Sequence, residues 1–230
     1  GSMQMSNNGN VVWSQYSGGY GTYDIWLYDS TKPISPTNPA NLTNNPTDSS
    51  YYTAVRADDP QINDNGHMVW SSNKPIAPST YRRYNIYLYD GTVTSNLTQN
   101  TLPSMKPQIN NNGDVVWHSK GGYWGYNADI YLYDGTGVTN LTVHSVDYYN
   151  QLYHSDPQIN DNGHVIWHQK SRVYSAGAGW SNVSDIYLYD GSASNLTKNP
   201  SSNNNYGHIY NLQINNSGHI VWDHKRRITS

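Results

Sequence analysis

The stretch DIYLYDG occurs at Asp129–Gly135 and again at Asp185–Gly191, and close variants stand at Asn85–Gly91 (NIYLYDG) and Asp24–Ser30 (DIWLYDS). Its Ile and Leu alternate with aromatic residues, which is the two-residue period of a β-strand whose two faces are both covered. The Asp-Gly pair that ends it is typical of a tight turn. A strand and a turn that occur four times in 230 residues indicate a repeat protein.

A second motif precedes each copy of the first and recurs once more near the C-terminus. It joins an Asn-Gly or Ser-Gly turn to a short β-branched run that ends in tryptophan, as in NDNGHVIW at Asn160–Trp167. Successive tryptophans of this motif are 57, 47, 50 and 55 residues apart, a spacing in the range of β-propeller blades. These tryptophans are Trp13, Trp70, Trp117, Trp167 and Trp222.

Each repeat can be divided into four short strands, of which PQIN is the first, HVIW the second, DIYLYD the third and VTNLT the fourth. Copies that stack around an axis cover both faces of every such sheet, which one sheet alone cannot do. We therefore expect an all-β fold, a single β-propeller domain over residues 1–230 with about five blades of four antiparallel strands and an incomplete last blade. The repeat units are residues 4–59, 60–106, 107–156, 157–211 and a partial unit at 212–230.

The last unit contains Trp222 but no copy of IYLYD after it. A five-bladed ring with a thin last blade is the first interpretation, and a fragment of a longer propeller is the alternative. In both cases strand edges are exposed, and exposed edges pair with other chains. A homodimer through the incomplete blade edge is the expected assembly.

The run PQINDNGHVIW, followed by DIYLYDG and NLT, resembles the repeats of TolB-like β-propellers over nearly the whole chain. The resemblance implies a propeller fold and a periplasmic, secreted or cell-surface protein. Propellers of this kind serve as scaffolds, bind peptides or sugars, or hydrolyse substrates, so the resemblance implies no single function.

Composition excludes several classes of function. The chain has no cysteine, so it has neither disulfides nor thiolate metal sites. Lys and Arg number 13 against 16 Asp, which gives no basic field for nucleic acid. No apolar run approaches the roughly 20 residues of a membrane span. Tyr and Asn are abundant and Glu is absent, a balance more typical of extracellular, periplasmic or cell-surface proteins.

The segments between the second and third strands, and the connections between blades, are expected to be long loops on one face of the molecule. All seven carry Tyr or Trp beside short polar residues, as SRVYSAGAGW does at residues 171–180. Such surfaces suit sugars, whose C–H groups stack on rings while amides take the hydroxyls. They also suit protein surfaces, where Tyr, Trp and Arg dominate the binding energy. A third interpretation is that these rings only brace their own loops.

We therefore expect a secreted or cell-surface binding module that takes a glycan, with a protein- or peptide-binding propeller, or a scaffold without a ligand, as the alternative. The candidate binding residues are the aromatic and polar side chains of the loops and strand starts. The aromatic candidates are Tyr20, Tyr52, Tyr81, Tyr123, Trp124, Tyr149, Tyr153, Tyr174, Trp180 and Tyr206. The polar candidates are Arg56, Asp59, Arg83, Lys106, His118, Asp156, His168 and His208.

Several polar candidates recur at fixed repeat positions. Three directly precede a proline and are expected to alternate in charge at the mouth of an axial channel: Asp59, Lys106 and Asp156. Three others share a position in the connections between blades: Arg56, Tyr153 and His208. His118 and His168 directly follow a repeat tryptophan and are expected at the entrances of loops.

Nothing in the sequence marks a catalytic centre, and we expect no enzyme. A glycosidase or lyase stays open, because it needs only two or three converging carboxylates. The loop acids left for that role are Asp48, Asp58, Asp59, Asp147 and Asp156. We expect no metal and no cofactor, with calcium at the NDNG turns as the alternative, although Asn-Gly there is explained by the turn itself.

The four NLT sequences, which begin at Asn41, Asn96, Asn140 and Asn195, match the N-glycosylation pattern. Their regular recurrence favours a role in a strand turn.

Overall fold

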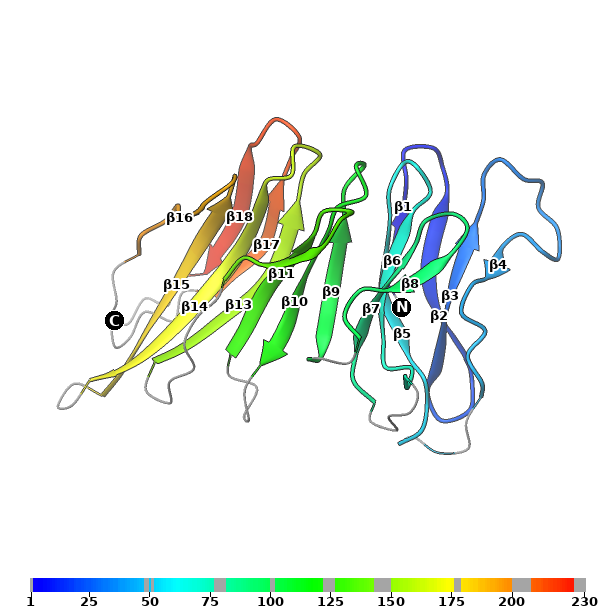
Figure 1. Cartoon of the computed structure of the whole chain (residues 1–230), viewed down its shortest axis with the longest axis horizontal. Coiled ribbons are helices and arrows are strands. Elements are labelled where there is room, and N and C mark those ends of the chain that lie inside the picture. The colour runs from blue at the N-terminus through cyan, green and yellow to red at the C-terminus, as the bar shows by residue number, and fades with distance from the viewer. Residues whose placement is uncertain are drawn as a thin grey trace. The chain divides into compact units, whose positions relative to one another are not determined.

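The computed structural model describes residues 2–47, 50, 52–76, 82–99, 102–121, 127–142, 150–175, 179–199 and 208–225. The side chains of seven residues at the ends of these ranges or inside a strand lie outside that description: Gly121, Asn127, Asn150, Val173, Ser175, His208 and Lys225. Within this part of the chain every regular element is a β-strand (Figure 1). No helix with the length and apolarity that a membrane span needs is found there.

The chain divides into two compact units, Gly1–Val115 and Val116–Ser230. Unit 1 contains two complete four-stranded antiparallel sheets, ordered β1-β2-β3-β4 and β5-β6-β7-β8, and then β9. Each sheet is one repeat, and we call it a blade. The strands of unit 1 are β1 (Met3–Met5), β2 (Val11–Gly18), β3 (Thr22–Tyr28), β4 (Ala40–Asn41), β5 (Ala57–Ile62), β6 (Met68–Ser72), β7 (Asn85–Tyr89), β8 (Thr94–Asn96) and β9 (Ser104–Ile109).

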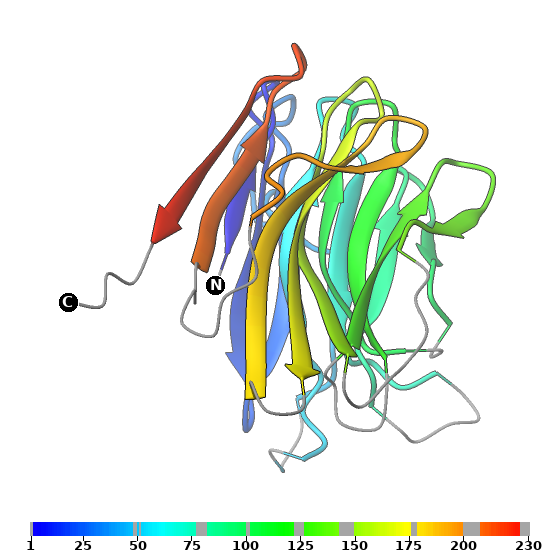
Figure 2. The ribbon, with the colours of Figure 1, turned by 90° about the vertical axis from the view of Figure 1, so that its left-hand side faces the viewer.

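Unit 2 holds the rest of the third repeat, a complete fourth blade ordered β13-β14-β15-β16, and the two-stranded sheet β17-β18. The fourth blade joins β11 through one parallel bridge, Ala128 to Tyr153. The long hairpin β14–β15 and the two-stranded sheet are visible in Figure 2. The strands are β10 (Val115–Gly121), β11 (Asn127–Tyr133), β12 (Val138–Asn140), β13 (Asn150–Ile159), β14 (Val165–Ser175), β15 (Gly179–Tyr189), β16 (Ala193–Asn195), β17 (His208–Ile214) and β18 (Ile220–Lys225).

Both faces of a complete blade are buried against neighbouring blades. In the fourth blade, Val165 and Trp167 of β14 pack with Val116 and Ile130 of the third repeat. Ile166, on the opposite side of the same strand, packs with strand β17 of the fifth repeat. Side chains of successive strand residues point to opposite faces, so this alternation buries the whole run VIW. In unit 1, Val12 and Met68 meet in the same way between the first and second blades.

The third residue of DIYLYD stacks on the repeat tryptophan, and the two lie directly opposite each other on paired strands. Ring centroids are 6.0 Å apart for Trp70–Tyr87 and 5.7 Å apart for Trp167–Tyr187. The first blade places a second tryptophan there, Trp26, which lies 6.4 Å from Trp13. Cross-strand aromatic pairs stabilise a sheet beyond the area they bury, which accounts for the repeated Trp and Tyr.

The first residue of DIYLYD and the NLT sequence form one hydrogen-bonded lock between the third and fourth strands. In the fourth blade, Asn195 Nδ2 and Thr197 Oγ1 donate to the two carboxylate oxygens of Asp185 over 3.0 and 2.8 Å. Thr197 Oγ1 also accepts the amide of Ile186. The first and third repeats have the same lock at Asp24 and Asp129. This confirms a strand-turn role for NLT.

The Asn-rich turns tie one blade to the next. In unit 1, Asn63 Nδ2 donates to the carbonyl of Asn110 over 2.9 Å, and the amide of Asp64 donates to Asn111 Oδ1 over 2.9 Å. In unit 2 the corresponding bonds join Asn160 and Asp161 to the turn at residues 215–216. NDNG therefore recurs for two reasons. Its Asn and Asp residues bond to the turn of the next blade, and its glycine adopts a positive φ, such as +81° at Gly66.

The predicted all-β fold of four-stranded antiparallel sheets with an incomplete last sheet is confirmed. The single domain over residues 1–230 stays a prediction. One expectation was wrong in the first, third and fourth repeats, where the segments taken for long loops after the repeat tryptophan continue largely as strands. In the second repeat, most of the predicted loop at residues 77–84 lies outside the described residues. β14 runs to Ser175, β15 begins at Gly179 and these two residues pair, so the described residues of the segment 171–180 belong to strands. Its small and polar residues concealed the two-residue period.

Candidate functional site

Aromatic rings gather at the end of the β2–β3 hairpin in unit 1. Tyr16 and Tyr23 lie opposite each other on the two strands, with their ring centroids 5.8 Å apart, edge to face. The guanidinium carbon of Arg56 lies 5.8 Å from the centroid of Tyr23. A Cβ added at Gly21 would come within 3.1 Å of Arg56 Nη2, so this side chain packs closely on the turn that also carries the exposed Tyr20. We call Tyr16, Tyr20, Tyr23 and Arg56 the first tip cluster.

Unit 2 has the same arrangement at the end of the β14–β15 hairpin. Tyr174 and Trp180 are cross-strand partners with centroids 5.2 Å apart. The guanidinium carbon of Arg172 lies 4.2 Å above the Trp180 ring, a distance at which cation–π attraction is effective. Tyr174 and Trp180 were both predicted as binding residues, and the structure brings them together. Arg172 was not among the predicted residues.

A broad groove runs beside the first tip cluster on the first blade. Its volume is about 560 Å³, which lies within the roughly 300–1,000 Å³ of small-ligand sites. Tyr16 and Trp26 supply its aromatic surface, and the exposed side chains of Gln15, Asn44 and Thr47 supply amide and hydroxyl groups. We call it the blade 1 groove. Its lining residues are Gln15, Tyr16, Ser17, Gly18, Asp24, Trp26, Asn41, Asn44, Asn45 and Thr47.

The one carboxylate of this lining is held as an anion by the lock described above. Burial raises the pKa of Asp24, but hydrogen bonds from the Asn45 amide, Thr43 and Asn41 outweigh burial and leave that pKa below its ordinary value of 3.8. Asp24 therefore organises the floor of the groove as a hydrogen-bond acceptor. A carboxylate with a lowered pKa is poorly matched to proton transfer near neutral pH.

Trp26 Nε1 is buried and has no hydrogen-bond partner among the described residues. Nε1 atoms of Trp117 and Trp167 share this condition in the part of the chain that the structure describes. A buried indole donor without a partner thus also occurs away from the groove, and it does not by itself mark the groove as a binding site.

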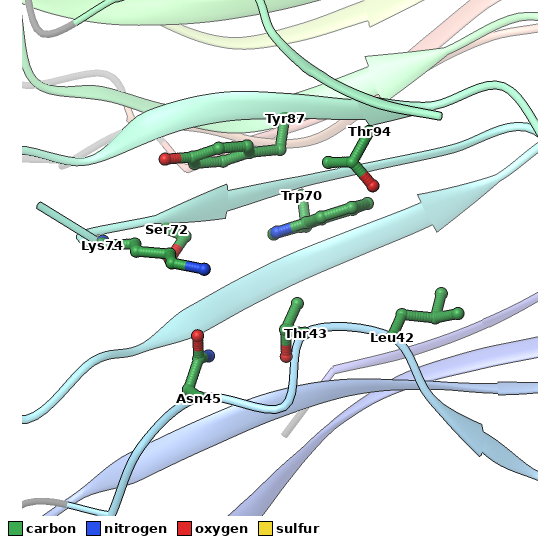
Figure 3. A pocket seen from close by; sticks show the side chains of 8 residues that line it. All are labelled: Leu42, Thr43, Asn45, Trp70, Ser72, Lys74, Tyr87 and Thr94. Carbon is green, nitrogen blue, oxygen red and sulfur yellow. The ribbon is translucent and has the colours of Figure 1, made fainter. Parts of the chain in front are cut away.

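A smaller pocket lies between the first and second blades within unit 1 (Figure 3). Trp70 and Tyr87 face Leu42 and Thr43 across it, and Lys74 lies at one end. Its volume of about 140 Å³ is below the range of small-ligand sites. It is a packing groove between these two blades.

Two adjacent acids begin strand β5 beside a tyrosine. Tyr84 OH donates to Asp58 Oδ2 over 3.2 Å. Burial raises the pKa of Asp58, and the neighbouring Asp59 raises it further. Burial also raises the pKa of Asp59, against which the Lys106 ammonium acts. Burial and Asp58 raise the pKa of Tyr84 to about 12. The structure thus brings together the predicted residues Asp59 and Lys106.

The residues that directly precede PQI or LQI share one backbone conformation. Their φ angles are 53°, 53°, 54° and 51°, in the left-handed region. At Asp59, Asp156 and Asn211 the register between the first and second strands shifts. Such a bulge redirects the strand at the same point of each repeat, and Asp and Asn adopt it more readily than Lys. The four residues are Asp59, Lys106, Asp156 and Asn211.

The predicted histidines lie inside strands. His118 belongs to β10 and His168 to β14, and both are buried. His168 Nε2 lies 2.8 Å from Ser184 Oγ on the paired strand. The expectation that they stand at loop entrances was wrong, because the strands continue past the repeat tryptophans.

The other predicted residues are dispersed. Tyr52 is 88% exposed in the connection before β5, and Arg83 is exposed just before β7. Tyr153 is half-buried in β13, where Asp156 Oδ2 accepts a bond from Ser155. His208 begins β17, but its side chain lies outside the described residues. Five aromatic candidates lie wholly outside them: Tyr81, Tyr123, Trp124, Tyr149 and Tyr206.

Among the residues that the structure describes, no group of three or more His or Asp side chains is placed to hold a metal ion. The carboxylate of the NDNG turn in the second blade accepts bonds from protein donors instead. Asp64 accepts from the amide of Asn7 over 2.8 Å, from Asn7 Nδ2 over 2.9 Å and from Asn111 Nδ2 over 3.1 Å.

Sequence reasoning missed most of the groove. Gln15, Asn44 and Thr47 are ordinary polar residues, and they meet only because the end of the fourth strand returns to the β2–β3 hairpin. One signal was available. Trp26 replaces the tyrosine of DIYLYD in the first copy alone, and an exception in a strict repeat points to a local role.

No family model matches the chain, and no curated protein matches it in sequence. Solved structures that are similar include the β-propeller domain of the trilobed protease from Pyrococcus furiosus, at 13% identity and a TM-score of 0.49 over 82% of this chain and 48% of that one. The acylaminoacyl peptidase of Pyrococcus horikoshii is 15% identical, with a TM-score of 0.49 over 95% of this chain and 31% of that one. An α-L-arabinanase of Penicillium chrysogenum, solved with arabinobiose, is 12% identical, with a TM-score of 0.45 over 96% of this chain and 74% of that one.

The chain thus spans less than half the length of the two peptidase chains. At these identities the likeness concerns the fold alone, and it says nothing about a ligand.

Proposed function

We propose that this chain is a non-catalytic, carbohydrate-binding β-propeller module of the cell surface or the extracellular space, and that the blade 1 groove is its glycan site. The observation that carries the proposal is an aromatic surface bordered by exposed amide and hydroxyl groups in one groove of about 560 Å³. The aromatic surface comes from Tyr16 and Trp26. The exposed polar groups come from Gln15, Asn44 and Thr47.

A neutral sugar matches this chemistry at both kinds of surface. Its C–H faces lie well on a half-exposed ring such as that of Tyr16, and its hydroxyls both donate to and accept from side-chain amides. The Asn44 backbone has a φ of 41° and is fixed by a bond from its amide to Asn41 Oδ1, so its side chain is presented on a rigid turn. A rigid, preformed surface reduces the entropy lost on binding.

A catalytic role receives no support from the groove, since its carboxylate is committed to the lock and has a lowered pKa. The pair Asp58–Asp59 is the place where hydrolysis would have to be sought in unit 1. We expect the chain to bind its glycan without hydrolysing it.

A glycan array probed with the whole chain tests the proposal. Tyr16→Ala should lower the affinity for the bound glycan by about tenfold or more, as expected for a central aromatic contact. The matched control is Tyr174→Ala, which removes an exposed tyrosine from the equivalent hairpin end of unit 2 and should leave the affinity unchanged. An array with no bound glycan, or equal effects of the two variants, would contradict the groove as the site.

A second pair of variants separates binding from folding. Asn44→Gly removes the amide but keeps a backbone with positive φ, so the turn should survive while glycan binding weakens. Gln99→Gly makes the same backbone change at the corresponding position of the second blade, where φ is 49°. Equal melting temperatures of the two variants with different affinities would assign the loss to the Asn44 side chain.

A protein partner is the second candidate, and the tip cluster of unit 2 favours it. Trp, Tyr and Arg are the residues that dominate protein–protein binding energy, and Arg172, Tyr174 and Trp180 lie together there. A pull-down that captures one defined protein with the whole chain, and loses it with Trp180→Ala, would support this alternative.

A further inference from the structure

The long hairpin β14–β15 (Figure 2) has cationic, aromatic and amide side chains on one face of its outer half. Alternate residues of a strand point to the same face, so Lys170, Arg172 and Tyr174 of β14 share one face. Trp180 of β15 stands opposite Tyr174 and therefore lies on that face as well. Asn182 stands opposite Arg172 and does so too. We call these five residues the hairpin strip.

The outer half of this hairpin is not needed to pack the blade. Strands β14 and β15 have 11 residues each, whereas β10 and β11 of the third repeat have seven. In the two apolar clusters that unit 2 shares between its repeats, the residues from β14 end at Trp167. His168 Nε2 and Ser184 Oγ, 2.8 Å apart, then close the inner end of the strip. The residues beyond them are available for another role.

The two cations of the strip have no acidic partner. Neither Lys170 nor Arg172 forms an ion pair with any residue that the structure describes. The Trp180 ring covers one face of the Arg172 guanidinium, whose N–H donors lie in its plane and point away from the ring. The first tip cluster differs in this respect, because burial raises the pKa of Asp58 there and the Arg56 guanidinium acts against it. The hairpin strip thus carries positive charge that the described residues do not neutralise.

The strip also contains a buried amide without a hydrogen-bond partner. Asn182 is 4% exposed, and its side chain makes no hydrogen bond within the described part of the chain. Buried polar groups in folded proteins are nearly all hydrogen-bonded, so this amide indicates a polar group that the hairpin itself does not supply. A side-chain amide both donates and accepts, which matches a sugar hydroxyl.

The aromatic pair supplies the third feature of the strip. Tyr174 is 42% exposed, and its ring is tilted by 59° to that of Trp180. A half-exposed ring suits the C–H face of a sugar. An acidic peptide would satisfy the cations, but an acidic sugar offers an anion, hydroxyls and a C–H face within a single ring. The three features together therefore favour the sugar.

We propose that the hairpin strip binds an acidic sugar residue of a glycan, one that bears a carboxylate or a sulfate group. The acidic group lies against Arg172 and Lys170, which suits the planar donor fork of arginine. A hydroxyl bonds to the Asn182 amide, and the C–H face lies on Tyr174. This site is separate from the blade 1 groove of unit 1, in which the charged lining residue is an acid, Asp24. The inference does not rest on that groove.

The test compares matched ligands on the unchanged whole chain by calorimetry. The first pair is a tetramer of galacturonic acid and its methyl ester, and the second is a tetramer of galactose with and without sulfate groups. We expect saturable binding of at least one acidic member, and the uncharged member of its pair should bind about tenfold more weakly or worse, because a charge-assisted bond is lost. Raising the salt concentration to about 1 M should also weaken binding of the acidic sugar. The two pairs distinguish a carboxylate from a sulfate ligand.

Variants of the protein then locate the site. Arg172→Lys keeps the charge but loses the planar fork and the stacking on Trp180, so we expect about a tenfold loss of affinity for the acidic sugar. Asn182→Asp places a carboxylate opposite Arg172 and should weaken binding as well. The matched control is Arg83→Ala, which removes an exposed arginine from unit 1 and should leave the affinity unchanged. Tyr16→Ala should also leave it unchanged, which separates this site from the blade 1 groove.

Several results would overturn the proposal. They are equal affinities for an acidic tetramer and its uncharged counterpart, an unchanged affinity of Arg172→Lys, and no saturable binding of either acidic tetramer up to about 1 mM. A peptide of aspartate residues that binds more tightly than both acidic tetramers would overturn it too, and would favour the protein partner. A neutral glycan that binds through Tyr16, with no acidic sugar bound, would refute this inference and leave the proposed function intact.

Discussion

Single polar residues join the third and fourth strands in the first, third and fourth repeats. The carboxylate of Asp185 is buried and accepts bonds from Asn195, Thr197 and the amide of Asn199. Unpaired donors in such a place cost far more than a hydrogen bond gains, so the residues of the lock depend on one another. This dependence explains why the first residue of DIYLYD and the NLT sequence recur together.

Removing the acceptor should destabilise the protein substantially. Asp185→Ala leaves the donors of Asn195, Thr197 and Asn199 unpaired, and we expect a loss of about 2–4 kcal/mol in the free energy of unfolding. Asp190→Ala, in the exposed turn of the same hairpin, should change it by less than about 0.5 kcal/mol. Urea denaturation of the two variants measures the difference, and similar midpoints would refute the structural role of the lock.

The acids of the Asp-Gly turns should make the protein sensitive to acid. The pKa values of Asp90 and Asp134 are lowered to about 2 from 3.8, Asp90 by the Val93 amide and then Thr92, and Asp134 by Thr136 and then the Gly137 amide. A lowered pKa in the folded state means stability that is present above the ordinary value and lost as pH falls from about 4 to about 2. The double variant Asp90→Asn, Asp134→Asn keeps the acceptor oxygens but cannot titrate.

Urea midpoints recorded between pH 5 and pH 2 test this expectation. The natural chain should lose stability more steeply than the double variant. The acids at the start of β5 act in the opposite direction, because burial raises the pKa values of Asp58 and Asp59 and so favours their protonated forms on folding. If the urea midpoints of the two proteins fall equally as the pH is lowered, the turn acids contribute nothing to the pH dependence of stability.

Strands of this protein are stable because two faces are buried at once. The run VIW of β14 packs Val165 and Trp167 on one side and Ile166 on the other. β18 has the same sequence pattern but leaves Val221 exposed. The same motif should therefore contribute more to the free energy of unfolding in β14, where both faces are buried, than in β18, where Val221 is exposed.

Truncating the equivalent residues should show this difference directly. Ile166→Ala removes a fully buried side chain and should lower the free energy of unfolding by about 2–5 kcal/mol. Val221→Ala, at the matching place in β18, should change it by less than about 0.5 kcal/mol. A large loss for Val221→Ala would mean that β18 is covered by another part of the protein in solution.

The Asn-rich turns should need no metal. Protein donors from Asn7 and Asn111 already surround the Asp64 carboxylate. We therefore expect the melting temperature to be the same in calcium and in a chelator. A rise of several degrees in calcium would show that these turns bind the ion.

Most of the strands could be predicted from the sequence, because they repeat and their turns contain Asn-Gly or Asp-Gly. The hairpin ends could not, since Gly19 and Gly21 in the first blade and the small residues before Trp180 interrupt the pattern while strand pairing continues on either side. Histidines that follow the repeat tryptophans were therefore expected in loops although they are buried in strands. Local pattern gives no measure of how far a hairpin extends.

At the scale of the whole molecule, the fold is shared by proteins of different activity, so the function has to be argued from its sites. The blade 1 groove is lined by both Gln15 and Thr47, which are far apart in sequence, and no periodicity connects them. Only the exceptional Trp26 indicated it. The tip clusters were easier to anticipate, because Tyr174 and Trp180 stand close together in the sequence as well as in space.

A crystal structure of the chain with a glycan identified on an array is the most direct test of the proposed function. We expect one sugar ring on Tyr16, with its hydroxyls bonded to the side chains of Asn44 and Gln15. A glycan bound only at the tip of unit 2, or at the acids of β5, would contradict the blade 1 groove as the binding site.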